Sequence, residues 1–190
     1  MDRNYSKSFT KLMDLEGVRE GANDMGGTTK HGVTQPVFDN WRAMTGGPRE
    51  SVLVLEKAEA YALFYNMFWR TTGASSLPDG LDFAVFQAGV NIGDRMAVIL
   101  LQRILGVTAD GMVGPQTLAA VKTWPLDSLI ATFLQSQKDY YDKVIARHPT
   151  QVSNFDGWMN RVDNSLAFIK AHWLGVATGT AFFSRPRPLG

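Results

Sequence analysis

Cysteine is absent from this chain of 190 residues. A protein without thiols forms no disulfide and has no cysteine nucleophile, iron–sulfur cluster or thiolate zinc site. The three histidines, His31, His148 and His172, lie far apart in the sequence and show no ligand spacing such as HxxxH. We therefore predict that the protein has no metal site and needs no cofactor.

Charge of one sign is not in excess either. Lys and Arg number 19 and Asp and Glu number 18, which gives a net charge of +1. A protein that works by binding nucleic acid usually has a stronger basic excess, so no nucleic-acid partner is expected.

Long apolar runs are also missing. Apolar stretches such as 83–86 and 98–101 are far shorter than the ~20 apolar residues that a membrane span needs. The N-terminal segment MDRNYSKSFTKLMDLEG is charged and contains no apolar h-region. We therefore predict neither a secretory signal peptide nor stable membrane insertion.

The chain does have enough apolar mass for a core, with 45% hydrophobic and 11% aromatic residues. Apolar residues recur at helical spacing along most of the sequence, which predicts a mainly α protein. The predicted helices cover about residues 5–16, 35–45, 51–70, 81–91, 94–105, 115–122, 126–147 and 155–174. The segment 81–91 is almost entirely apolar, so we expect that helix to be buried on most sides.

One stretch between the first two predicted helices breaks this pattern. It runs from Glu16 to Val33 and holds five glycines in 18 residues, two carboxylates eight positions apart and two adjacent threonines. Glycine permits positive φ angles and close backbone approach, as a hairpin or the edge of a cleft requires.

The two carboxylates that lie eight positions apart in this stretch are Glu16 and Asp24. A glutamate at the end of a buried helix can be partly desolvated, which raises its pKa and suits it to act as a general acid. A second carboxylate in a wetter loop would stay ionised, and such a pair is the minimum equipment for cleaving a glycosidic bond. The alternative is a solvated turn whose Asp and Thr side chains cap backbone groups.

The order and spacing of these residues resemble glycoside hydrolase family 108, the muramidases found among phage endolysins and their bacterial relatives. The matching motif reads Glu16-Gly17, Asp24 and Gly26-Gly27-Thr28-Thr29-Lys30-His31-Gly32-Val33-Thr34, and continues through Gln35, Trp41-Arg42, Glu59-Ala60 and Trp69. The second half resembles the peptidoglycan-binding-type region that accompanies the family. The matches there are Val90-Asn91-Ile92-Gly93, Ala97, Leu101-Gln102, Leu105-Gly106, Asp110-Gly111, Gly114 and Thr117.

This resemblance covers about residues 9–175 and implies roles for individual residues. Glu16 would be the general acid that protonates the leaving glycosidic oxygen. Asp24 would stabilise positive charge on the sugar or assist a water molecule, and Thr29 would orient that water. The residues expected to contact the substrate are Thr28, His31, Gly32 and Asn91.

Some assignments leave two readings open. The family has a second glycine where this chain has Val18. It has a tyrosine where this chain has His31, so His31 either contacts the sugar or has a structural role. Asn91 either caps the turn between two helices or faces the cleft. Glu20 is a rival acid, but it lies outside the matched motif and reads as a surface charge. Asp110 reads as a cap in a tight turn that leads into a helix.

The expected architecture is a lysozyme-like helical fold with a small β-hairpin-like insertion after the first helix. We predict an N-terminal catalytic lobe over 1–75 with its catalytic loop at 16–34, and a helical lobe over 76–175 packed with it as one unit. The remaining residues, 176–190, form a loose tail. The cleft is expected between the two lobes, and the protein is expected to be a monomer.

The predicted function is hydrolysis of the β-1,4 bond between N-acetylmuramic acid and N-acetylglucosamine, with peptidoglycan glycan strands as the partner. The simplest biology is a bacteriolytic phage endolysin, kept in the host cytoplasm until its release and acting on the cell wall in the periplasm. Two alternatives are a lytic transglycosylase, which leaves a 1,6-anhydro product, and a non-catalytic peptidoglycan-binding protein.

Overall fold

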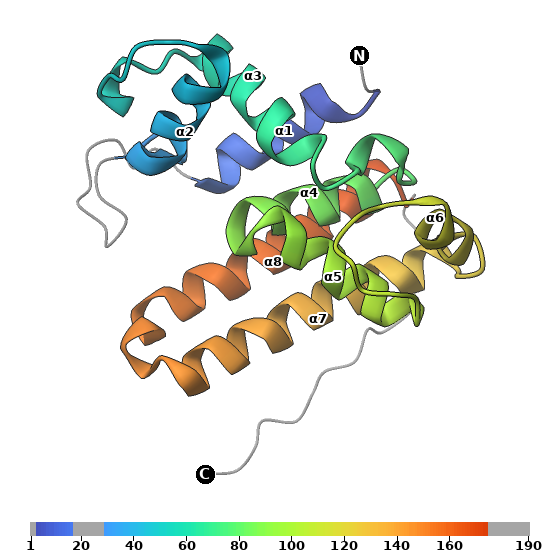
Figure 1. Cartoon of the computed structure of the whole chain (residues 1–190). Coiled ribbons are helices and arrows are strands. Elements are labelled where there is room, and N and C mark those ends of the chain that lie inside the picture. Colours follow the sequence, from blue (N-terminus) through green and yellow to red (C-terminus); the bar gives the residue numbers. More distant parts are fainter. Residues whose placement is uncertain (1–2, 17–28, 175–190) are drawn as a thin grey trace.

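The computed structural model describes residues 3–16 and 29–174. These residues form a mainly α-helical structure with one small hairpin, which confirms the predicted fold class (Figure 1). The helical elements are α1 (Tyr5–Glu16), α2 (Gln35–Thr45), α3 (Lys57–Phe64), α4 (Leu81–Ile92), α5 (Asp94–Leu105), α6 (Pro115–Val121), α7 (Leu126–Arg147) and α8 (Val152–His172). Shorter turns are η1 (Val52–Val54), the π-helical η2 (Tyr65–Trp69), η3 (Ala74–Ser76) and η4 (Pro149–Gln151).

The hairpin follows the first helix, as predicted. Strand β1 (Thr29–Lys30) pairs antiparallel with β2 (Val33–Thr34), and α2 begins at the next residue. Pro36 lies in the first turn of α2, where a missing N–H leaves no helical hydrogen bond unmade. The helix ends at Gly46, whose φ of 71° is the left-handed conformation that suits a glycine C-cap.

Helix α4 is the central element, and nine consecutive residues from Leu81 to Gly89 are buried. It contacts α5, α7 and α8 on the C-terminal side of the chain, and α1, η2 and η3 on the N-terminal side. Figure 1 shows α4 between the α1–α3 part of the molecule and the antiparallel pair of α7 and α8. The prediction of a helix buried on most sides is therefore confirmed.

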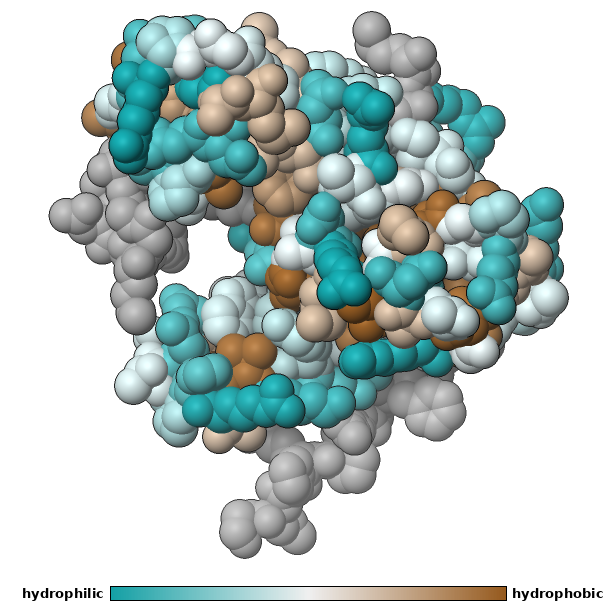
Figure 2. Space-filling view, viewed as in Figure 1, coloured by the Kyte–Doolittle hydropathy of each residue, from teal (hydrophilic) through white to brown (hydrophobic). Residues whose placement is uncertain are grey.

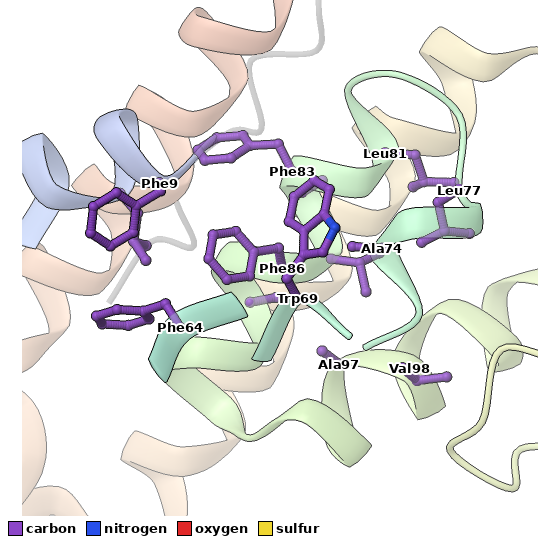
Figure 3. Close-up of a cluster of buried hydrophobic side chains, with 14 of the residues drawn as sticks. Phe9, Phe64, Trp69, Ala74, Leu77, Leu81, Phe83, Phe86, Ala97 and Val98 are labelled. Atoms are coloured by element: carbon purple, nitrogen blue, oxygen red, sulfur yellow. The ribbon is translucent and has the colours of Figure 1, made fainter. Parts of the chain in front are cut away.

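One hydrophobic core runs through both halves of the described chain, from Tyr5 in α1 to Ile169 in α8. Figure 3 shows its centre, where Phe86 of α4 meets Trp69 of η2 with the ring centroids 5.3 Å apart. Phe9 of α1 lies on the other side of this cluster. Side chains of both halves of the described chain therefore fill the same core.

The helix predicted over 51–70 is confirmed over 57–69, where α3 continues directly into η2, but its first part is wrong. Ser51 accepts a hydrogen bond from the N–H of Leu53 and so caps only the three-residue turn η1. Leu55 then leaves the helical region with φ −59° and ψ 119°, and α3 begins at Lys57. Val52 and Leu55 are both fully buried. They have the spacing of a helix, but they reach the core from an irregular connection. The last helix was also misplaced, because α8 begins at Val152 rather than near 155.

None of the helices in the described part of the chain is long and apolar enough to cross a membrane. The predicted loop 16–34 is described only at Glu16 and from Thr29 onward, and the predicted tail 176–190 lies outside the described residues.

Candidate active site

Helix α1 ends at Glu16, the predicted general acid. On one face of this helix Tyr5, Phe9 and Leu12 are at most 3% exposed. The ring of Tyr5 meets the edge of Tyr61 with the centroids 4.6 Å apart, and its hydroxyl donates to the Tyr61 carbonyl oxygen. These contacts fix α1 against α3, so the backbone of Glu16 has a defined place relative to the core.

Polar contacts hold the start of α1 against the start of α4. The side-chain amide of Asn4 donates to Asp79 and to Asp82, each at 2.8 Å, and Arg3 pairs with Asp79. Asp82 also accepts hydrogen bonds from two backbone N–H groups at the start of α4. Burial raises the pKa of Asp82 to about 6, whereas the Arg3 guanidinium lowers the pKa of Asp79. This cluster anchors the end of α1 that lies farthest from Glu16.

The hairpin is closed by two residues with positive φ, His31 at 52° and Gly32 at 74°. Two positive φ angles in a two-residue connection are those of a type I′ turn, which matches the natural twist of paired strands. Thr29 pairs with Thr34 across the strands, and the neighbouring Val33 is 1% exposed and belongs to the core. Thr29 therefore lies on a hairpin that the buried Val33 side chain attaches to the core.

A glutamine that follows the hairpin fastens it to the connection before α3. The side-chain amide of Gln35 donates to the carbonyl oxygen of Glu50 at 2.8 Å, and its oxygen accepts from the N–H of Val52 at 2.6 Å. From the hairpin, the Lys30 ammonium donates to the carbonyl oxygen of Leu53 at 2.8 Å. Three backbone groups of one irregular segment are thus satisfied by side chains from β1 and α2.

Arg42 of α2 joins the same region to α3. Its Nη2 lies 2.9 Å from Glu50 Oε2 and 3.4 Å from Glu59 Oε2, and its guanidinium lies over the ring of Phe38 at 4.7 Å. Trp41 donates from Nε1 to Glu59 Oε1 at 3.1 Å. Gln35, Arg42 and Glu59 belong to the family resemblance in the sequence, which implied no role for them. In the structure their side chains connect α2, α3 and the segment between these helices.

The Glycosyl hydrolase 108 family matches residues 9–93, and the family described as Predicted Peptidoglycan domain matches residues 96–163. We refer to residues 9–93, which are similar to that family, as the hydrolase 108 domain. Eleven chains of solved structures also match. One is SagA of Brucella abortus, with a TM-score of 0.79 and 25% sequence identity over 93% of this chain and 99% of that chain. Comparison with curated proteins gave no match.

These findings support a glycoside hydrolase that acts on peptidoglycan. The hydrolase 108 match ends at residue 93 and the peptidoglycan-domain match begins at 96, so the boundary falls between α4 and α5. Helix α4 belongs to the first match, but it packs on α5, α7 and α8 of the second half. The hydrolase 108 domain therefore completes its core with residues of the region that follows.

The predicted site residues fall in four groups, the last of which is Asn91 alone. Thr29, His31 and Gly32 come together in the hairpin of the hydrolase 108 domain. Glu16 is placed by its backbone at the end of α1. Asp24 and Thr28, together with Val18 and Glu20, lie outside the described residues. The catalytic and substrate-binding roles of all these residues stay predictions, while the turn geometry gives a structural reason for His31 and Gly32.

Asn91 lies on a different element, in the last turn of α4. Its side-chain amide donates to the carbonyl oxygen of Gln87 at 2.8 Å, one turn earlier in the same helix. Gly93 ends the helix with a φ of 90°. The amide of Asn91 is thus engaged within α4, and its contact with a sugar stays a prediction.

Asp110 has the structural role that the sequence favoured. Its Oδ1 accepts from the side-chain amide of Gln102 at 2.7 Å and from the N–H of Met112 at 2.9 Å. These hydrogen bonds lower the pKa of the Asp110 carboxyl. Gly111 follows with a φ of 80° and donates its N–H to Gln102. The motif is therefore a tight turn before α6.

Figure 2 shows the molecular surface hollowed between the α1–α3 part of the hydrolase 108 domain and the far ends of α7 and α8. The sequence predicts the cleft between the N-terminal and helical lobes, and the place of substrate binding stays a prediction. Across residues 3–16 and 29–174, no group of three or more His, Asp or Glu side chains is arranged to hold a metal ion.

Proposed function

We propose that this peptidoglycan hydrolase is an N-acetylmuramidase, which cleaves the β-1,4 bond between N-acetylmuramic acid and N-acetylglucosamine. The observation that carries the proposal is the position of Glu16. It is the last residue of the core-anchored helix α1, it lies within the hydrolase 108 match, and the hairpin with Thr29 begins 13 residues later.

In the proposed reaction the protonated Glu16 carboxyl donates its proton to the glycosidic oxygen as the bond to the sugar carbon breaks. The positive charge that develops on the sugar is stabilised by the Asp24 carboxylate. A water molecule adds to the sugar carbon, supplies the new hydroxyl group and loses its other proton to the solvent, from which the Glu16 carboxylate is reprotonated. Thr29 orients this water. Its place on a strand supports this role, because a paired strand holds a hydroxyl group in a narrower range of positions than a loop.

The first test compares Glu16→Gln with Glu20→Gln. The two substitutions remove the same charge from the same stretch of chain, so Glu20→Gln is a matched control. Lysis of purified cell walls by Glu16→Gln should fall by about 10²–10⁴-fold, the usual contribution of a general acid. Glu20→Gln should stay within about threefold of the wild type. Full activity of a folded Glu16→Gln protein would refute the assignment.

Asp24 and Thr29 are tested in the same assay. Asp24→Asn should lose most of its activity while it still sediments with cell walls, because only the charge is removed. An unchanged rate would reduce Asp24 to a cap in a turn. Thr29→Val keeps the β-branched shape that favours a strand and removes only the hydroxyl group. It should lower kcat with little change in thermal unfolding.

We also propose that the enzyme acts as a phage endolysin, held in the cytoplasm of the host until it is released to the periplasm. The peptidoglycan substrate class supports this biology. The test is expression in a bacterium with and without a co-expressed holin. Lysis that depends on the holin supports the proposal, and lysis that proceeds equally well without it contradicts it.

A further inference from the structure

A groove of about 830 Å³ lies between α7, α8 and the end of α5. Almost all of its lining falls within residues 96–163, the region that matches the peptidoglycan domain. Its volume is in the range of pockets that enclose a small molecule or a few residues of a peptide. It is formed by a different part of the chain from α1 and the hairpin, so the reaction proposed above makes no use of it.

One wall of the groove is a polar face of α7. Ser128, Thr132, Gln135 and Asp139 follow one another at intervals of three or four residues, so their side chains lie along one side of the helix. The other face of α7 is apolar and belongs to the core. The core packing of α7 uses only its apolar face, so the polar face along the groove is available to contact a ligand.

The opposite wall and the floor come from α8 and are partly apolar. Val162 and Leu166 line the groove together with Leu134 of α7. The Lys138 ammonium of α7 pairs with the Asp163 carboxylate of α8 at 2.5 Å, and this pair joins the two walls. The Lys138 side chain is 25% exposed and the Asp163 side chain 60% exposed, so both charges are open to solvent and to a ligand.

The groove thus combines two carboxylates, one ammonium group, hydroxyl and amide groups, and small apolar surfaces. The glycan strand of peptidoglycan offers hydroxyl and acetamido groups, which need no such charges. Its peptide stem offers small alanine side chains, free carboxylates and the ammonium group of a diamino acid. Charge complementarity therefore favours the peptide over the glycan.

We infer that the groove between α7 and α8 binds the peptide stem of peptidoglycan. The ammonium group of the diamino acid lies at Asp163 and Asp139, a carboxylate of the stem lies at Lys138, and alanine methyl groups contact Leu166. This inference rests on the proposed function, because it takes the wall polymer as the substrate. It gives the second half of the chain a substrate-binding role separate from that of the hydrolase 108 domain.

The test titrates the full-length protein with a synthetic stem tetrapeptide, L-Ala-γ-D-Glu-diaminopimelate-D-Ala, and reads the binding by calorimetry. Asp163→Asn should weaken binding at least tenfold. Asp142→Asn, which changes an exposed residue of α7 outside the groove, is the matched control and should bind like the wild type. Acetylation of the free amine of diaminopimelate should weaken binding as much as Asp163→Asn does.

A second variant, Ala131→Trp, fills the groove from α7 without changing a charge. It should abolish peptide binding while the thermal unfolding temperature stays near that of the wild type. The inference is refuted if the peptide fails to bind, if Asp163→Asn and Asp142→Asn bind alike, or if peptide-free glycan chains compete with the tetrapeptide.

Activity measurements separate this inference from the proposed function. On intact walls Asp163→Asn should raise KM and leave kcat unchanged, and on glycan strands stripped of their peptides it should act like the wild type. Equal KM values on intact walls would contradict the groove alone. If the wild type releases no muramic acid ends from either substrate, the proposed function fails, while the titration still reports on the groove.

Discussion

The turn between α5 and α6 depends on one buried side chain, Gln102, which is 1% exposed. The two hydrogens of its amide nitrogen are shared among Asp110 Oδ1 at 2.7 Å, the Met112 carbonyl oxygen at 2.9 Å and Thr117 Oγ1 at 3.2 Å, and its oxygen accepts from the Gly111 N–H at 2.8 Å. Gln102→Met keeps the shape and removes these hydrogen bonds.

Each of these hydrogen bonds contributes about 0.5–1.5 kcal/mol, and a buried group that loses its partner costs about 1–3 kcal/mol. Water can replace the partner at the exposed Asp110 and Met112, but not at the buried Gly111. We therefore expect Gln102→Met to lower the free energy of unfolding by about 3 kcal/mol. For a domain of this size that corresponds to a fall in Tm of about 6–12 °C.

Urea denaturation followed by circular dichroism measures this loss. Gln135→Met is the matched control, because Gln135 is exposed on α7 and bonds only to the neighbouring Asp139 within the hydrogen bonds described for it. The control should change stability by less than about 0.5 kcal/mol. If Gln102→Met costs under about 1 kcal/mol, the assignment of the turn's stability to these hydrogen bonds is wrong.

Three further predictions follow from other buried or strained positions. The pKa of Asp82 is raised from 3.8 to about 6, so the folded state holds this proton more tightly than the unfolded chain. Its contribution of up to about 3 kcal/mol is complete below pH ~4 and is lost as the pH rises through 6. Denaturation from pH 4 to 7 should show this loss, and Asp82→Asn should remove it. His31→Asn should keep the turn and the stability, because asparagine tolerates positive φ, whereas His31→Val should cost about 1–2 kcal/mol by thermal unfolding. Gln87 donates to Gln137 at 2.7 Å in the core. Each single change to Leu should cost about 1–3 kcal/mol, and the double change should cost clearly less than the sum in a double-mutant cycle.

The burial of α4 could be predicted because most of its residues are apolar. The position of the hairpin was also predictable, since glycines break the helical spacing between two clear helices. The break at Leu55 was not, because Val52 and Leu55 have the spacing of a helix and reach the core from an irregular segment. Apolar spacing alone does not distinguish these two cases.

The candidate site was predictable as a motif but not as an arrangement. The His31-Gly32 pair has a composition that suits a type I′ turn, and its φ angles agree. The hydrogen bonds of Gln35 to the backbone of Glu50 and Val52 could not be predicted from any pattern in the sequence. They join residues 15 and 17 positions apart, and whether they form depends on the path of the intervening chain.

Digestion of purified peptidoglycan tests the central claim most directly. The products of the wild type and of Glu16→Gln are reduced with borohydride and analysed by mass spectrometry. Muramidase activity with Glu16 as the general acid predicts muramitol ends from the wild type and almost none from Glu16→Gln. Anhydromuramic acid ends from the wild type would instead make the enzyme a lytic transglycosylase, and muramitol ends in equal amounts from both proteins would remove Glu16 from the mechanism.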